Sequence, residues 1–308
     1  MFEVILQMTG LLACGVIWRV LKPGGLDYQQ TRSVLTSLVY YVMLPALVLS
    51  VLWEAQLGQN TLLIALSAAA GVIAGLLLSF LTCRACKSSS AQTGAIILAV
   101  AFPNVTYMGL PVMETTFGSW ARGVAIQYDL FACTPLLFTL GILIASRLGS
   151  GERQRSPFAE LLRIPALWAA ILAVLLNLTA VPMPSLIKGW LQLLERGVVP
   201  LMLFSIGLSL DWQQTRLREL PRLLPILSLR LFVVPLIVLG VTTLLGFTGE
   251  WRAAIVMEAA MPSMVLGIVI SDRFKLDVSL YASAVTVTTL ASLFTLPLWY
   301  RWLMSLHG

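Results

Sequence analysis

Two long hydrophobic stretches of this sequence are interrupted by proline and glycine, and they lie about half a chain length apart. The first interruption spans residues 101–111 and the second spans residues 259–267. Proline removes a backbone hydrogen-bond donor and clashes with the preceding helical turn. In a lipid bilayer, each backbone group released by a break must find a partner inside the protein or in a water-filled cavity. Paired interruptions of this kind, one in each half of a chain, are typical of the binding site of a secondary transporter. The interrupting residues are Pro103, Gly109, Pro111, Pro262 and Gly267.

The composition indicates a protein that lies within a membrane. Of the 308 residues, 58% are hydrophobic and 11% are charged, whereas a soluble domain carries about 25% charged residues. The apolar runs are about 20 residues long, which is enough for a helix to cross a hydrocarbon core of about 30 Å. They lack the short alternating pattern of a membrane β-barrel. The sequence therefore predicts an all-α integral membrane protein.

Ten membrane-spanning helices are predicted from the hydrophobic runs. Their limits are residues 3–21, 31–52, 61–82, 94–117, 123–146, 163–181, 186–210, 222–245, 251–271 and 278–300. The first span has no basic segment before it and no small-residue cleavage site after it, so we expect it to be retained. The polar connection 148–160 separates an N-terminal repeat (1–147) from a C-terminal repeat (161–308), each with five spans. Because five is an odd number, the two repeats insert with opposite orientations.

The basic residues predict the orientation of the chain. Most of the 20 Lys and Arg residues lie in connections that follow odd-numbered spans, and only Arg122, Lys188, Arg252 and Arg301 lie on the opposite side. Loops rich in Lys and Arg remain in the cytoplasm. Both termini are therefore expected on the outer, periplasmic side. The net charge of +6 follows from this bias and does not indicate a nucleic-acid partner.

The two interruptions are predicted to meet near the middle of the membrane. Pro103 and Pro262, and likewise Gly109 and Gly267, are separated by almost the same number of residues. At 1.5 Å per residue, the prolines lie roughly 14 and 17 Å from the starts of their spans, which enter from opposite sides. The N-terminal ends of half-helices suit an anion such as a carboxylate. The alternative is that each proline merely kinks its helix.

Polar residues inside the spans are candidates for binding, because polar groups are costly in a membrane. Asn104 offers two donors and one acceptor at the predicted crossing. The alternative role for such residues is to satisfy the broken backbone or to bridge helices. The predicted substrate-binding set consists of Asn104, Thr106, Tyr107, Gln127, Asp129 and Ser263.

Two carboxyl groups are predicted to couple transport to an ion. Asp129 and Glu258 lie about two turns into their spans, where burial disfavours the charged form and allows a proton to bind and leave. The alternative is a permanent ion pair with Arg230 or Arg196. Arg230 could instead attract an anionic substrate. Glu195 and Arg196 are expected to extend toward the membrane surface.

Enzymatic chemistry is not expected from this sequence. The sole histidine, His307, lies in the tail, which excludes a Ser-His-Asp triad and a His-based metal site. The sequence contains no phosphate-binding loop. Cys83 and Cys86 form a lone C-x-x-C pair without a second pair. No cofactor or metal is therefore expected.

Residues 103–111, Pro-Asn-Val-Thr-Tyr-Met-Gly-Leu-Pro, resemble the crossover motif of the auxin efflux carrier family. This family includes plant PIN-type carriers and bacterial dicarboxylate carriers. Residues 259–262, 281–284 and 296–298 and Pro45 extend the resemblance over essentially the whole chain. It implies a ten-helix fold like that of sodium/proton antiporters, with two inverted five-helix repeats and broken, crossing helices four and nine. Spans one, two, six and seven would form a scaffold, often dimeric, and spans three to five and eight to ten a transport domain.

The resemblance also implies a function. Asn104 matches the asparagine that contacts the substrate carboxylate, whereas Asp129 lies near a position that is glutamine in the plant carriers, which leaves an auxin-like substrate open. We expect a homodimeric secondary transporter of small organic anions, mono- or dicarboxylates, in a bacterial inner membrane, working by elevator-type alternating access. The expected coupling ion is a proton, and the alternative is sodium. A channel and a non-transporting membrane sensor or receptor are the other candidates.

Overall fold

The computed structural model describes residues 2–55, 58–150, 162–209 and 220–306. Within these ranges the regular structure is helical, apart from one isolated antiparallel bridge between Pro103 and Ser263. Residues 151–160 of the predicted central connection, residue 210 at the predicted end of a span, and His307 lie outside the described residues.

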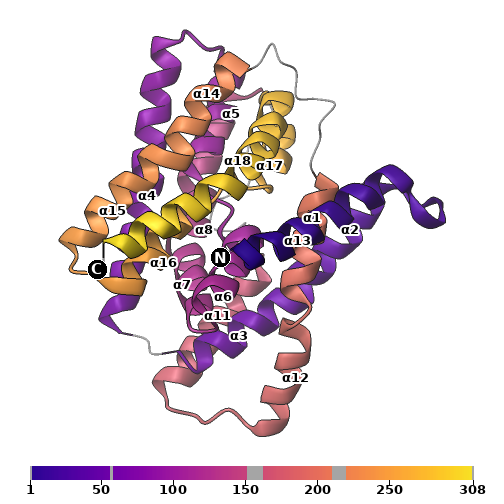
Figure 1. Cartoon of the computed structure of the whole chain (residues 1–308), viewed down its shortest axis with the longest axis vertical. Helices are drawn as coiled ribbons and strands as arrows, with labels where there is room; N and C mark the ends of the chain where they lie inside the picture. Colours follow the sequence, from indigo (N-terminus) through magenta and orange to yellow (C-terminus); the bar gives the residue numbers. More distant parts are fainter. Residues whose placement is uncertain (1, 56–57, 151–161, 210–219, 307–308) are drawn as a thin grey trace.

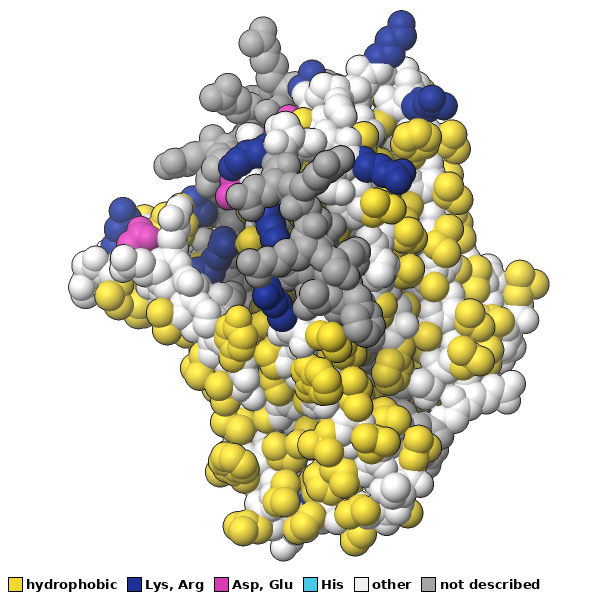
Figure 2. Space-filling model, turned by 180° about the vertical axis from the view of Figure 1, so that it is seen from behind, with side chains coloured by type: hydrophobic (Ala, Val, Ile, Leu, Met, Phe, Trp, Pro, Cys, Tyr) yellow, Lys and Arg dark blue, Asp and Glu magenta, His cyan; other side chains and the backbone are white. Residues whose placement is uncertain are grey.

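Six helical stretches of the described chain are long and apolar enough to cross a membrane, and three shorter apolar helices accompany them. On the face shown in Figure 2, Lys and Arg side chains gather in the upper half, and hydrophobic side chains cover the lower half. This surface identifies a multi-pass integral membrane protein. The long stretches are Tyr28–Trp53, Gln59–Ala85, Ala121–Leu148, Ser185–Ser209, Arg222–Leu244 and Val278–Ser305, and the short helices are Thr9–Leu21, Ser90–Ala101 and Pro165–Leu178.

The helices pack in two groups, of which the first combines the beginning and the middle of the chain (Figure 1). Helix α1 packs on α13, and α3 packs on α11 and α12. Gly15 of α1 and Gly207 of α13 allow a close approach, because a Cβ at Gly15 would lie 2.9 Å from the Cα of Gly207. The elements of this group are α1 (Phe2–Leu21), η1 (Pro23–Gly25), α2 (Tyr28–Leu38), η2 (Val39–Met43), α3 (Leu44–Trp53), α11 (Pro165–Leu178), α12 (Ser185–Glu195) and α13 (Val198–Ser209).

The second group contains both interrupted helices. Helix α4 packs on α5 and α15, α15 packs on α16, and α18 contacts α5, α14 and α16. The first interrupted helix consists of α5 (Ser90–Ala101), η3 (Val105–Gly109) and α6 (Leu110–Phe117), and the second of α16 (Gly249–Ala259) and α17 (Gly267–Arg273). The other elements are α4 (Gln59–Ala85), α7 (Ala121–Tyr128), η4 (Asp129–Cys133), α8 (Thr134–Leu136), η5 (Leu137–Gly141), α9 (Ile142–Leu148), α14 (Leu220–Ser228), η7 (Leu229–Val233), α15 (Val234–Leu244) and α18 (Val278–Ser305).

Four π-helical turns each end two residues before a proline: η2 before Pro45, η3 before Pro111, η4 before Pro135 and η7 before Pro235. In each, the N–H of the residue before the proline donates to the carbonyl five residues back. Such wider turns accommodate a proline ring without breaking the helix, and they are frequent at functional sites. Tyr40, Thr106, Tyr107, Asp129 and Arg230 all lie in these turns.

Candidate binding site at the helix crossing

The two interruptions lie side by side and run antiparallel to each other. The N–H of Asn104 donates to the carbonyl of Pro262 at 2.8 Å, and the N–H of Met264 donates to the carbonyl of Phe102 at 3.1 Å. This pair of hydrogen bonds joins the breaks of two helices whose sequences are far apart. The crossing therefore satisfies part of the backbone that Pro103 and Pro262 release.

Side chains satisfy other carbonyls that the first break exposes. The Ala99 carbonyl has no partner at Pro103, which lacks an N–H, and it accepts the Ser263 hydroxyl at 2.7 Å. The Val100 carbonyl accepts Nη1 of Arg230 at 2.7 Å, because the N–H of Asn104 bonds to the other helix.

The second break is tied to α18 in the same manner. The N–H of Ser263 donates to Oγ1 of Thr288 at 3.1 Å, and the hydroxyl of Tyr281 donates to the Met264 carbonyl at 2.9 Å. Arg230 also donates to the Ala259 carbonyl at the end of α16.

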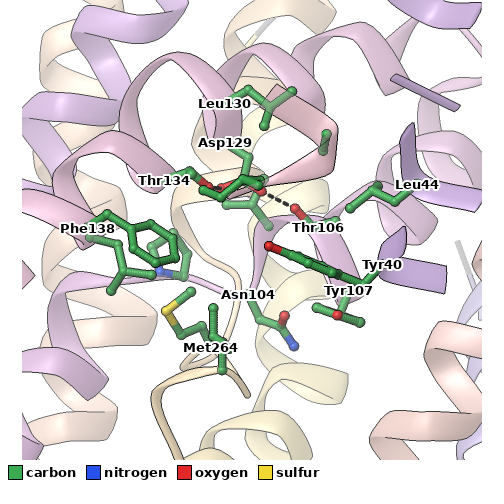
Figure 3. Close-up of a pocket in the computed structure, with 16 residues that line it drawn as sticks. Tyr40, Leu44, Asn104, Thr106, Tyr107, Asp129, Leu130, Thr134, Phe138 and Met264 are labelled. Carbon is green, nitrogen blue, oxygen red and sulfur yellow. Dashed lines mark hydrogen bonds between the residues drawn. The ribbon is translucent and has the colours of Figure 1, made fainter. Parts of the chain in front are cut away.

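A cavity of about 100 Å³ lies beside the first break (Figure 3). Asn104, Thr106 and Tyr107 line it from the break, and Asp129 and Thr134 line it from another wall. The rest of its lining includes the apolar residues Leu44, Phe138, Met264 and Leu266, together with Tyr40. The cavity therefore combines a few polar groups with an apolar wall, as small-molecule sites commonly do.

Asp129 is held by hydroxyl groups on two sides. Thr106 donates to one carboxylate oxygen, and Thr134 donates to the other at 2.9 Å. Residues five apart on an α-helix lie about 140° apart around the axis. The π-helical turn η4 removes this separation, so Thr134 reaches the side chain of Asp129.

Asn104 lines the cavity and carries a buried side-chain amide. Its side chain is 2% exposed, and its Nδ2 has no hydrogen-bond partner among the described residues. The backbone carbonyl of Asn104 accepts hydrogen bonds from the N–H groups of Met108 and Gly109 at 3.2 and 3.0 Å, and these bonds begin the helix η3–α6. The first N–H groups of a helix lack intrahelical partners and carry partial positive charge. The buried amide and this helix start together favour a negatively charged ligand.

A second, more polar cavity adjoins the first. It measures about 400 Å³ and shares Tyr40, Tyr107 and Leu266 with the Asn104 cavity. Its polar lining consists of Arg32, Thr36, Ser37, Ser205 and Ser209, together with Tyr41. Arg32 gives this approach to the Asn104 cavity a positive charge.

A third cavity, of about 530 Å³, is lined by α3, α7 and α12 and contains several charges. Arg122 pairs with Glu195 at 3.2 Å, and Lys188 pairs with Glu54 at 2.8 Å. Arg122 thus links α7 of the second helix group to α12 of the first. Between the Asp129 wall and this part of α7, Leu44, Val48 and Leu110 among others surround a void of only about 20 Å³.

Comparison with known proteins identifies the family. The model of the membrane transport protein family matches residues 11–300. The chain belongs to this family, the family of the auxin efflux carriers. Its members are transporters and not enzymes. The chain is 32% identical over 302 residues to an uncharacterized transporter of Methanothermobacter thermautotrophicus, and 24% identical over 304 residues to an uncharacterized transporter of Methanocaldococcus jannaschii, covering at least 96% of each chain. It is also 23% identical over 238 residues, 64% of each chain, to a probable auxin efflux carrier component of rice, Oryza sativa subsp. japonica.

Within this membrane transport protein, the predicted substrate-binding residues fall into three places. Asn104, Thr106, Tyr107 and Asp129 share the cavity at the first break. Gln127 lies in the charged third cavity, although it is only two residues from Asp129. Ser263 lies in the crossing with its N–H and hydroxyl already bonded.

Glu258 and Arg230, the candidates for ion coupling, lie at the crossing but do not line the Asn104 cavity. Glu258 is fully buried, and neither carboxylate oxygen has a hydrogen-bond partner among the described residues. Its carboxylate packs against Gly109, where a Cβ would overlap it. No ion pair joins Glu258 or Asp129 to Arg230 within the described part of the chain.

The remaining selected residues shape the helices. Gly267 begins α17 and packs against the Tyr281 hydroxyl, leaving no room for a Cβ. Pro111 follows the π-helical turn η3 at the start of α6. Glu195, which we expected to extend toward the membrane surface, is instead paired with Arg122, whereas Arg196 is exposed.

Several lining residues were not selected from the sequence. Thr134 directly precedes Pro135, and Tyr40 lies in the π-helical turn before Pro45. Both are polar residues near a proline within a hydrophobic span, a pattern that could have identified them. Phe138 and Met264 are apolar residues of apolar segments and carry no such signal.

Proposed function

We propose that this chain is a secondary active transporter of small organic anions, and that it binds a carboxylate in the Asn104 cavity. The observation that carries this proposal is the buried Asn104 amide: this residue lines the cavity together with the start of helix η3–α6, and its amide nitrogen has no hydrogen-bond partner among the described residues. A carboxylate accepts hydrogen bonds from both kinds of donor. The cavity volume of about 100 Å³ favours a small mono- or dicarboxylate.

Asp129 is proposed to carry the coupling proton. An ionised Asp129 would repel an anion in the same cavity, whereas a protonated carboxyl group is neutral and can donate a hydrogen bond. The hydroxyls of Thr106 and Thr134 can act as donors or acceptors and so serve both forms. The anion and the proton would therefore bind together. Glu258, buried and without a hydrogen-bond partner among the described residues, is the second candidate for this proton.

The proposed architecture has ten spans in two inverted five-helix repeats. Spans one, two, six and seven form the scaffold, and spans three to five and eight to ten form the transport domain. The packing of the helices in two groups supports this division, and so do the two interrupted helices that cross antiparallel. The transport domain would move against the scaffold and expose the cavity to each side in turn. A homodimer would form through the scaffold.

The arrangement of cavities suggests which side is open. The Asn104 cavity adjoins the Arg32 cavity, whereas apolar side chains and the Arg122–Glu195 pair separate it from the opposite side. Positively charged loops remain in the cytoplasm, so the Arg32 side is proposed to be cytoplasmic and both termini to be external. The site would then face inward, in the plasma membrane of a bacterial-type cell.

Uptake into proteoliposomes tests this function. Radiolabelled malonate, malate and indole-acetate are offered separately under an imposed proton gradient, an imposed sodium gradient, or neither. The wild-type protein is compared with Asn104→Ala and Asp129→Asn, and with the matched controls Asn60→Ala and Asp272→Asn at exposed positions. We expect saturable uptake that is driven by the proton gradient. Asn104→Ala should need much higher anion concentrations, Asp129→Asn should no longer respond to the proton gradient, and the two control variants should resemble the wild type.

Two results would contradict the proposal. Ligand binding without flux in sealed vesicles would indicate a membrane sensor. Flux that does not saturate and is indifferent to Asn104 would indicate a channel.

A further inference from the structure

Arg230 occupies an unusual place, because it is a fully buried cation whose observed partners are backbone carbonyls. Its side chain is 1% exposed. Nη1 donates to the carbonyls of Val100 at 2.7 Å and Ala101 at 3.3 Å, and Nη2 donates to that of Ala259. Within the described chain, no ion pair joins it to a carboxylate.

The three carbonyls belong to the C-terminal ends of two different helices. Val100 and Ala101 end α5, and Ala259 ends α16. Each helix C-terminus carries about −0.5 of an elementary charge. Two such ends meet at the crossing, and the single charge of the guanidinium compensates both. In a buried site of low dielectric, this attraction is weakly screened.

The shape of the side chain fits this task. A guanidinium group is planar and presents its donors as a fork, so its two terminal nitrogens can bond to two helices at once. The π-helical turn η7 presents Arg230. The indole N–H of Trp299 donates to the carbonyl of the next residue, Leu231, at 2.8 Å and ties this turn to α18.

Carbonyls at the ends of broken helices are the ligands that coordinate sodium ions or protons in several transporters. Here the guanidinium of Arg230 already occupies the three carbonyls that it bonds. An external cation could bind to these carbonyls only if the guanidinium of Arg230 moved away. The buried positive charge of Arg230 would then lose the carbonyls that compensate it. The place of a bound cation is therefore filled by the protein itself.

We propose that Arg230 is the resident cation of the crossing, a positioning residue that joins the C-termini of α5 and α16 and replaces an external metal cation there. The part that concerns transport rests on the function proposed above, whereas the part that concerns the crossing does not. Removal of the side chain should leave a site for a free guanidinium ion. Sodium should have no role in the intact protein.

Chemical rescue tests this role. Arg230→Ala is purified in detergent and compared with Arg222→Ala, an exposed arginine of the same span. We expect Arg230→Ala to lower the melting temperature and to lose organic-anion uptake, and millimolar guanidinium to restore a large part of both. Urea, which is neutral and has nearly the same shape, should restore neither. Arg230→Lys, which keeps the charge but not the fork, should lie between the wild type and Arg230→Ala.

The wild-type protein supplies a test that does not depend on a variant folding. Replacing sodium by choline should change neither its melting temperature nor its uptake. Stabilisation or stimulation by sodium would overturn the proposal, as would equal rescue of Arg230→Ala by urea and guanidinium. If the wild type carries no organic anion, the function proposed above fails, and the melting temperatures alone decide the role of Arg230.

Discussion

The two helix breaks are built from similar sequences but differ in what they leave unused. At the first break, Asn104 lines a cavity and has a buried amide nitrogen without a hydrogen-bond partner among the described residues. At the second break, Ser263 uses both its N–H and its hydroxyl within the protein, and Tyr281 binds the carbonyl of Met264. The comparison indicates that the first break is available to a ligand, whereas the second break stabilises the first through hydrogen bonds within the protein. Substitutions at the first break should therefore change transport, and substitutions at the second should change stability.

The largest effect is expected for Asn104→Ala. Loss of a hydrogen bond to a charged group costs about 1.5–3 kcal/mol, which lowers the apparent affinity for the transported anion about 10- to 100-fold. The melting temperature should remain close to that of the wild type, because the amide nitrogen has no protein partner among the described residues. Concentration-dependent uptake and thermal unfolding in detergent measure the two quantities. A large loss of stability together with an unchanged affinity would remove the distinction between the breaks.

A change in coupling is expected for Asp129→Asn. The amide cannot bind the transported proton, so uptake should no longer respond to the imposed proton gradient, while exchange of labelled for unlabelled anion continues. Exchange and gradient-driven uptake in the same vesicles measure this difference. If Glu258→Gln loses the response to the proton gradient and Asp129→Asn keeps it, Glu258 and not Asp129 is the residue that binds the transported proton.

A stability effect is expected for Ser263→Ala at the second break. The variant leaves the Ala99 carbonyl without its hydroxyl partner, and an unsatisfied buried acceptor costs about 1–3 kcal/mol. The affinity for the anion should stay within about twofold of the wild type, because Ser263 is not among the residues that line the Asn104 cavity. Ser33→Ala, at an exposed position of α2, is the control. Loss of anion affinity without loss of stability would place Ser263 among the ligand contacts.

The smallest effect is expected for Glu195→Gln. The ion pair with Arg122 leaves 18% and 9% of the two side chains accessible, and the amide oxygen of the glutamine can still accept the hydrogen bond from Arg122, so the substitution removes only the charge of one partner. Because this pair links the two helix groups, its loss should favour the state that is open on that side. Cysteine labelling at Ser119, which lines the third cavity, measures the accessibility from outside. An unchanged labelling rate would show that the pair does not hold the groups together.

The sequence predicted an all-helical membrane protein, because a membrane requires long apolar helices, and six of the described helical stretches are long and apolar enough to cross it. It also selected the residues of both breaks, since Pro103 and Pro262 identify them by their chemistry. The grouping of Gln127 with Asp129 overlooked the geometry of the helix. Residues that are two positions apart on a helix lie about 200° apart around its axis, so Gln127 and Asp129 face different cavities.

The partners of the charged residues depend on contacts between distant segments. The sequence shows Arg230 in a hydrophobic span, but its carbonyl partners are more than twenty residues away or in the other half of the chain. Glu195 and Arg122 are likewise 73 positions apart. A single sequence contains no signal for such pairs.

The π-helical turns carry a consequence for the comparison of relatives by alignment. Each turn accommodates one residue more than an α-helical turn would. Deleting one residue from η4 would restore an ordinary α-helix and leave the span almost as long as before. Thr134 would then lie four positions after Asp129, only about 40° away around the helix axis, and would stay on the same face. A one-residue gap at residues 130–133 in an alignment would therefore be compatible with relatives that keep both this fold and the Asp129–Thr134 pair.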